Sequence, residues 1–275
     1  MPRNIIINSS NYDKVNNNFR YYLPVEQKFT NQEVALSYIS LYNSFYNTSS
    51  AYGNNQVTIA FQVGATMVSQ TFTIADSYNT ISDLNYQLQQ FMISQGWYLI
   101  NTATGANVYF ISLQTNSTQY KAQFTFTTVP TSRTGYTVPS NASAIPTIVS
   151  TPTITFNSAF GSLIGFSAST LPAITSSNQI LVSTLTPDIS VVNSLILTTN
   201  IIHHVGLSIP CNVFDAIALT SGFGSLITNT NSSIVYSDIA QNSYQYIEIK
   251  FHDQNLNALT LLDLDVLIIL SIKDK

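Results

Sequence analysis

The chain has 275 residues, of which 8% are charged and 45% are hydrophobic, and its formal net charge is −4. Nine scattered basic residues cannot supply the Lys/Arg patch that a nucleic-acid-binding face requires, so we expect no nucleic-acid partner. No apolar run approaches the ~20 residues of a membrane-spanning helix. The amino-terminal residues lack the apolar block of a signal peptide, so signal-dependent secretion is not expected.

The scarcity of charge is the most unusual property of the composition. An ordinary globular domain has about 25% charged residues, and here Asn, Ser, Thr, Gln and Tyr replace them. No charged residue lies between Arg133 and Asp188. A monomer normally stays soluble through mixed surface charge. A surface this neutral therefore predicts that other subunits cover much of it, and a low-charge coat that faces solvent is the alternative.

Period-two alternation of apolar and polar residues runs along the chain and predicts half-buried β-strands. In 56–63, one face carries Val57, Ile59, Phe61 and Val63. In 246–252, one face carries Ile247, Ile249 and Phe251, and the other carries Tyr246, Glu248, Lys250 and His252. Further strands are predicted at 33–42, 71–75, 107–113, 121–128, 153–156, 193–202 and 233–236.

One segment has helical periodicity instead. In 79–97 the apolar residues recur at helical spacing, at Ile81, Leu84, Leu88, Phe91 and Met92. Thr80 or Ser82 can cap the start and Gly96 can end the helix. We therefore predict one amphipathic helix of about four turns. The segment 129–152, which contains four prolines, is predicted to be a long surface loop or an insertion.

The last strand is predicted to begin at Leu264. It would place an unbroken apolar stripe on one face, made of Leu264, Val266, Ile268, Leu270 and Ile272. The opposite face is charged at both ends and apolar in its middle, a pattern typical of a strand inside a sandwich or at a subunit contact. Because a turn-forming segment separates this strand from 246–252, we predict that the two form an antiparallel hairpin.

A cluster of acidic residues near this strand is a candidate metal site. Asp263 and Asp265 share a face, and with Asp253 they could chelate Ca²⁺. The spacing is not that of an EF-hand, so the favoured interpretation is a solvated strand end.

Histidine and cysteine offer no clear site either. His203 and His204 are adjacent, so on a strand they point to opposite faces, and His252 is remote from them in sequence. Cys211, near Asp215, is interpreted as a small core residue. The chain also lacks a nucleophile-elbow motif and a phosphate-binding loop. We predict no catalytic, cofactor-binding or metal-binding residues, no cofactor, and a protein that is not an enzyme.

Five segments, taken in order, resemble penton-type minor capsid proteins of virophages and related polinton-like viruses. They are 33–61, 77–99, 158–166, 186–202 and 247–272. The resemblance implies an all-β, single jelly-roll β-sandwich with one amphipathic helix and a loop or β insertion. It also implies a homopentamer at the fivefold vertices of an icosahedral virion, assembled inside the infected host cell. The implied partners are further copies of the chain and a major capsid protein of the double jelly-roll type.

These expectations define a domain plan and a rival function. Residues 1–29 are predicted to be an N-terminal arm, and 30–275 a single jelly-roll domain with a possible insertion at about 97–152.

The alternative function is that of a receptor- or carbohydrate-binding β-sandwich, such as the head of a virion spike, because Tyr-rich neutral surfaces suit sugars and the chain has 16 Tyr. The oligomeric state discriminates the two, since spike heads are usually trimers.

Overall fold

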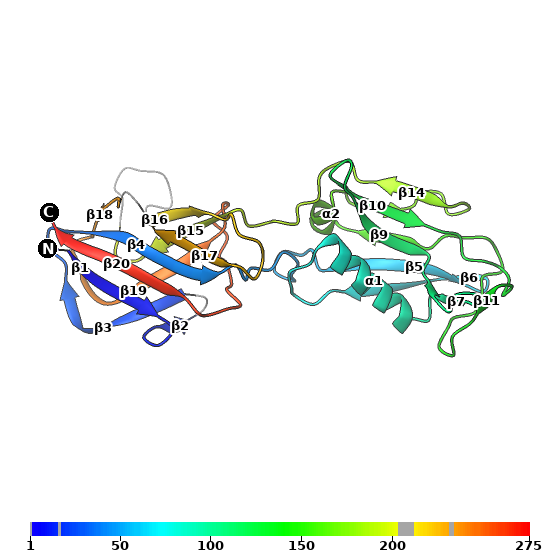
Figure 1. Ribbon diagram of the computed structural model, residues 1–275, viewed down its shortest axis with the longest axis horizontal. Coiled ribbons are helices and arrows are strands. Elements are labelled where there is room, and N and C mark those ends of the chain that lie inside the picture. Colours follow the sequence, from blue (N-terminus) through cyan, green and yellow to red (C-terminus); the bar gives the residue numbers. More distant parts are fainter. Residues whose placement is uncertain (1, 16–17, 203–211, 231–233) are drawn as a thin grey trace. The chain divides into compact units, whose positions relative to one another are not determined.

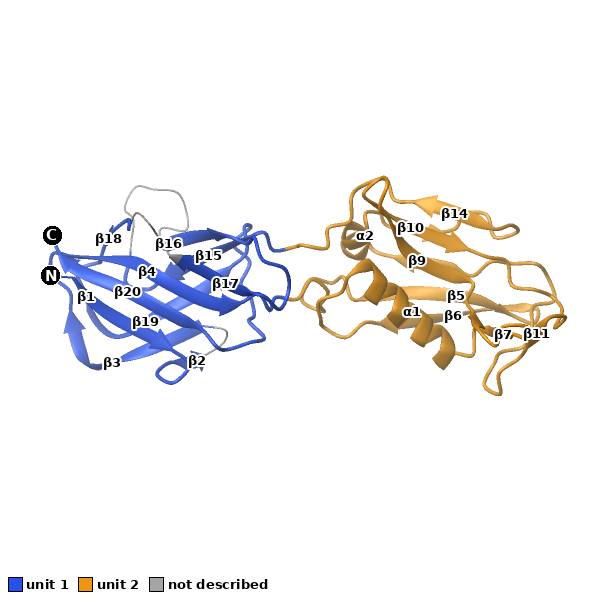
Figure 2. Ribbon diagram, viewed as in Figure 1, with its two compact units in different colours: residues 1–45, 192–275 blue, residues 46–191 orange. Residues whose placement is uncertain are grey.

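A computed structural model describes residues 2–15, 18–202, 212–230 and 234–275. The chain divides into two compact units (Figure 2). Unit 1 combines Met1–Phe45 with Val192–Lys275, and unit 2 is Tyr46–Val191. Each unit has its own hydrophobic core. The sequence predicted one domain with an insertion at about 97–152, whereas the structure has a second unit that begins earlier and ends later.

Unit 1 consists of two antiparallel sheets (Figure 1). The first sheet has the order β1-β20-β4-β17, and β18 pairs with β4. Its strands are β1 (Arg3–Asn8), β4 (Gln32–Tyr42), β17 (Leu226–Thr230), β18 (Ser237–Asp238) and β20 (Leu267–Asp274). The second sheet has the order β16-β15-β19-β3-β2. Its strands are β2 (Asp13–Val15), β3 (Asn18–Lys28), β15 (Ser194–Thr199), β16 (Val213–Ala218) and β19 (Ser243–His252).

The strand order of unit 1 is that of a jelly roll. The eight principal described strands, in chain order, are β1, β3, β4, β15, β16, β17, β19 and β20. Across the first sheet, neighbouring strands are the first, eighth, third and sixth of these. The second sheet runs second, seventh, fourth, fifth. Strands that follow each other in the chain therefore hold matching positions in opposite sheets, as two nested Greek keys require. The core between the sheets draws on both, with Ile39 and Ile268 from one and Leu197 and Ile249 from the other.

Two predictions about the ends of the chain were wrong. Residues 1–29 are not an arm, because β1 pairs with β20, and β3 pairs with β19. Phe19, only 2% exposed, lies in the core. The segments 246–252 and 264–272 do not form a hairpin either, since β19 and β20 lie in different sheets. The connection between them buries Leu259 and Leu261 in the same core, so it crosses from one sheet to the other.

The predicted facing of the terminal strand is confirmed within β20. Ile268, Leu270 and Ile272 are all 3% exposed or less and face the core. The strand begins at Leu267, however, and Leu264 lies before it and is 40% exposed. Alternation in β19 is also as predicted, because Ile247, Ile249 and Phe251 are buried in the core.

Unit 2 is a second β structure with two helices. Its four-stranded sheet is made of β13 (Ser169–Leu171), β12 (Thr153–Phe156), β5 (Gln56–Val63) and β6 (Thr66–Thr73). One three-stranded sheet is made of β14 (Gln179–Val182), β10 (Lys121–Phe126) and β9 (Ile111–Asn116). The other is made of β11 (Tyr136–Thr137), β7 (Leu99–Asn101) and β8 (Asn107–Val108). The predicted all-β architecture is thus confirmed for the residues that the structure describes. Neither of the two helices in these residues is long and apolar enough to cross a membrane.

The predicted helix is present as α1 (Ile81–Ser94). Thr80 and Asp83 form a capping box at its start, and Gly96 follows its end at a φ of 68°. A side chain at Gly96 would collide with the carbonyl oxygen of Asn141 at 1.9 Å, so only glycine fits there. Ile81, Leu84, Leu88 and Met92 are buried. A second helix, α2 (Ser158–Ile164), was not predicted, because seven residues are too few to show a helical period.

Further strands were missed, and all of them except the 11-residue β3 have six residues or fewer: β1, β2, β3, β7, β11, β13, β14, β16, β17 and β18. The prediction at 233–236 begins in a residue outside the described ones, and 234–236 contains no strand.

We predict that Ile268→Asp prevents folding. The substitution would place an unpaired carboxylate in the jelly-roll core at a cost of several kcal/mol, comparable with the ~5–15 kcal/mol stability of a whole domain. Ile6→Asp is the control, because Ile6 on β1 faces outward and is 50% exposed. Circular dichroism and solubility measure the outcome. A soluble Ile268→Asp protein with an unchanged spectrum would contradict this account of the core.

For α1 we predict that Leu88→Ala lowers the free energy of unfolding by ~2–5 kcal/mol, because it leaves a cavity beneath the helix. Gln90→Ala, on the exposed side of the same helix, should change it little. Urea denaturation curves of the two variants provide the measurement. Equal losses would show that the assigned helix phase is wrong.

Candidate functional site

The outward side of the first sheet in unit 1 is largely uncharged, and we call it the first outer face. Strand register places Ile6 of β1 beside Ile269 of β20, and Ile269 beside Tyr38 of β4. Two residues further along the same strands, Leu267 of β20 lies beside Ser40 of β4. Leu226, at the outer strand β17, is 46% exposed. An antiparallel sheet that faces water normally carries polar residues on that side, so this face has the character of a contact surface.

Charge on the first outer face of the described strands is confined to one end. There Lys273 pairs with Glu33 at 3.4 Å, and its ammonium lies 3.8 Å from the centre of the Tyr236 ring. Lys275 pairs with Asp238 at 2.7 Å on the same end. The paired signs leave little net charge to repel another copy of the chain.

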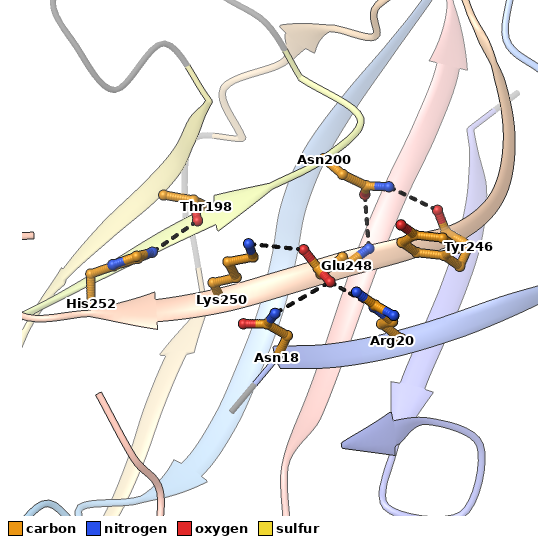
Figure 3. A network of polar contacts seen from close by, with 8 residues as sticks. All are labelled: Asn18, Arg20, Thr198, Asn200, Tyr246, Glu248, Lys250 and His252. Atoms are coloured by element: carbon orange, nitrogen blue, oxygen red, sulfur yellow. Dashed lines mark hydrogen bonds and ion pairs between the residues drawn. The ribbon is translucent and has the colours of Figure 1, made fainter. Parts of the chain in front are cut away.

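The outward side of the second sheet, the second outer face, is organised around the carboxylate of Glu248 (Figure 3). This side chain is 9% exposed, although it is on the outer side of β19. Arg20 Nε donates to it at 2.6 Å, and Lys250 Nζ lies 3.1 Å away. Asn18 Nδ2 donates at 3.4 Å. A nearly buried carboxylate needs such partners, since an unpaired one would carry a large desolvation cost.

Cross-strand register explains why these groups meet. Arg20 is directly opposite Glu248, and Tyr22 is opposite Tyr246. Arg20 also lies over the Tyr246 ring, with its guanidinium carbon 4.8 Å from the ring centre. On the other side, Asn200 accepts the backbone N–H of Glu248 at 2.8 Å and donates to the carbonyl of Tyr246 at 3.0 Å. The network therefore joins β3, β19 and the residue that follows β15.

The ionisation of Glu248 follows from this environment. Burial raises the pKa of the carboxyl, but the hydrogen bonds and charges of Arg20 and Lys250 outweigh burial, and the net pKa lies below its ordinary value of 4.5. The group is therefore a structural anion at neutral pH. A general acid at neutral pH would need the opposite shift.

Two acidic residues of the candidate Ca²⁺ site accept hydrogen bonds from nearby backbone groups. Asp253 is 5% exposed, and its Oδ1 accepts the backbone N–H groups of Asn255 and Asn257, both at 2.8 Å. Asp263 accepts the backbone N–H of Asp265 at 2.9 Å. Within the described residues, no group of three His, Cys, Asp or Glu side chains is placed to hold a metal ion.

The remaining candidate residues are not brought together either. His252 contacts the Thr198 hydroxyl at 3.1 Å and the Leu256 carbonyl oxygen at 3.2 Å, which makes it part of the second outer face. Asp215 accepts the backbone N–H of Ala216 at 2.8 Å. His203, His204 and Cys211 lie outside the described residues. The outward facing of Tyr246, Glu248, Lys250 and His252 was predicted from alternation, but the partners Arg20 and Asn200 were not.

Acid should weaken unit 1 through Glu248. The pKa of Glu248 is lower in the folded state than in the unfolded state, so the unfolded state takes up the proton more readily. The contribution of Glu248 to the free energy of unfolding is therefore complete above its unfolded-state pKa. This contribution is lost as the pH falls through the folded-state pKa. Urea denaturation from about pH 6 to about pH 3 should show a shallower loss of stability for Glu248→Gln than for the wild type. Glu26→Gln, on the exposed part of β3, is the control. Identical pH dependence in all three proteins would refute this role.

Comparison with known proteins gives a likeness to solved structures. No protein-family model matches the chain, and no curated protein matches it. Among solved structures, the crystal structure of mavirus penton protein is similar with a TM-score of 0.42 and 12% identity, over 100% of this chain and 95% of that chain. The jelly-roll assignment of unit 1 rests on its own strand order and register.

Proposed function

We propose that this chain is a structural capsid protein that forms pentameric capsomers at the fivefold vertices of an icosahedral virion. The observation that carries the proposal is the uncharged first outer face of a jelly-roll unit. It presents Ile6, Ile269 and Tyr38 side by side across three strands. Ile6 is 50% exposed and the other two side chains are partly exposed, and apolar groups that lie together at a surface mark a site that binds a partner.

The partner that best fits this face is another copy of the chain. A contact between two different faces of identical subunits is heterologous, and it closes into a ring when the rotation between neighbours divides a full turn. The first outer face would supply one side of that contact. Its few charges are already paired within the subunit, Lys273 with Glu33 and Lys275 with Asp238. Neighbours would therefore meet without unpaired like charges.

Five-fold closure and the viral setting come from the family resemblance of the sequence. In that setting the ring would fill a vertex among major capsid proteins of the double jelly-roll type, after assembly inside the infected cell. The role is geometric, and the proposal includes no catalytic step.

Native mass spectrometry of concentrated protein tests the proposal. The wild type should form a closed pentamer, and Ile6→Asp should remain folded but lose the pentamer, because each contact would bury a carboxylate. Ile180→Asp is the matched control, since Ile180 is 65% exposed but belongs to unit 2. A stable trimer, or a pentamer unaffected by Ile6→Asp, would contradict the proposal.

The ring should also resist salt. Apolar and neutral polar contacts lose little to ionic screening, which shortens the Debye length to ~3 Å at 1 M salt. Denaturant weakens apolar burial and should dissociate the ring. A pentamer that dissociated on addition of salt alone would keep the function but refute the uncharged interface.

The second candidate function is a receptor- or carbohydrate-binding head of a virion spike. A pocket beside the exposed Tyr120 in unit 2 favours it. This function predicts a trimer, so the same mass measurement separates the two.

A further inference from the structure

Unit 2 contains an open pocket of about 480 Å³, a volume within the range of small-ligand sites. Its walls come from four parts of the unit: the start of α1, the end of β9, the turn into β10, and the segment 186–190 that follows β14. The pocket contains none of the candidate site residues identified from the sequence. All of its lining residues belong to unit 2.

The wall formed by 186–190 is held in place by backbone contacts. The N–H of Asp188 donates to the carbonyl of Ser162 at 3.2 Å. The carbonyl of Ile189 accepts from Nδ2 of Asn47 at 2.9 Å, and Asn47 is 1% exposed. On the opposite wall, Lys121 donates to the carbonyl of Thr184. The pocket is therefore formed before any ligand arrives, which reduces the entropic cost of binding.

Tyr120 is the most unusual residue of the pocket. It is 78% exposed and has a φ of 58°, in the left-handed region that a bulky residue rarely adopts. The turn between β9 and β10 could be made at lower conformational cost by Gly or Asn. An exposed aromatic ring on a strained turn at the edge of a pocket indicates a binding role.

The chemistry of the lining selects among ligand classes. One cation, Lys121, and one anion, Asp188, balance each other, so the pocket does not favour a phosphate or another strongly charged ligand. The hydroxyls of Thr115, Thr186 and Ser190 both donate and accept hydrogen bonds. A purely apolar ligand would leave such groups without partners. A ligand that carries many hydroxyls would satisfy them.

We propose that this pocket binds a neutral saccharide. The negative π face of Tyr120 would pack against the C–H face of a sugar ring, whose hydrogens carry partial positive charge. The carboxylate of Asp188 can accept hydrogen bonds from neighbouring sugar hydroxyls. The apolar part of the wall, which includes Ile81, Pro187 and Ile189, would contact the less polar side of the ring.

The test begins with the full-length protein on an array of neutral, sialylated and sulfated oligosaccharides. Neutral oligosaccharides should be retained in preference to charged ones. Titration calorimetry in solution with the best-retained neutral oligosaccharide then removes the multivalency that a ring adds on a surface. Tyr120→Ala should weaken binding about tenfold or more, whereas Tyr120→Phe, which keeps the ring, should retain it.

Tyr86→Ala is the matched control, because Tyr86 is 61% exposed on α1 and does not line the pocket. It should leave the affinity unchanged. No retention on the array, preference for sialylated or sulfated glycans, or equal affinity of Tyr120→Ala and the wild type would each overturn the proposal. Pentamer formation by Tyr120→Ala is read separately by native mass spectrometry, so failure of this site is distinguishable from failure of the capsid role.

Discussion

The structure of unit 1 depends on the central positions of its last two strands. β20 lies between β1 and β4, and β19 lies between β15 and β3. Both strands direct alternate apolar residues into the same core, which includes Ile249, Phe251, Ile268 and Leu270. Without them neither sheet is continuous. The jelly roll can therefore close only after the chain has passed through all of unit 2, and such non-local pairing is slow to form.

Unit 1 can accommodate unit 2 as an insertion between two of its strands. The two segments of unit 1 are joined by pairing and by a shared core, so the chain between Phe45 and Val192 can fold around a core of its own. Surface connections accept long insertions at a small entropic cost because loop-closure entropy grows slowly with length. In the functions proposed above, unit 1 supplies assembly contacts and unit 2 supplies a ligand pocket.

The scarcity of charge has a structural counterpart. Around Glu248, Arg20 and Lys250 form a compact group, and Lys273 with Glu33 forms a second one at the end of the first outer face. The rest of that face is apolar or neutral. The composition therefore indicated the kind of surface, but the register of β1, β20 and β4 determines where Ile6, Ile269 and Tyr38 meet.

The sequence by itself determined the facing of residues and the position of the main helix. Alternation in 56–63, 246–252 and 268–272 shows which side chains face the core, because side chains on a strand alternate whatever its partner is. The capping box at Thr80 likewise depends on neighbouring residues only.

Strand partners, unit boundaries and the pocket were decided by the tertiary structure alone. Backbone N–H and C=O groups are alike in every strand, so the choice of partner depends on packing between distant segments. For this reason the segments 246–252 and 264–272 were expected to pair and instead lie in opposite sheets. The pocket combines residues near 80, 120 and 188, whose proximity no local pattern records.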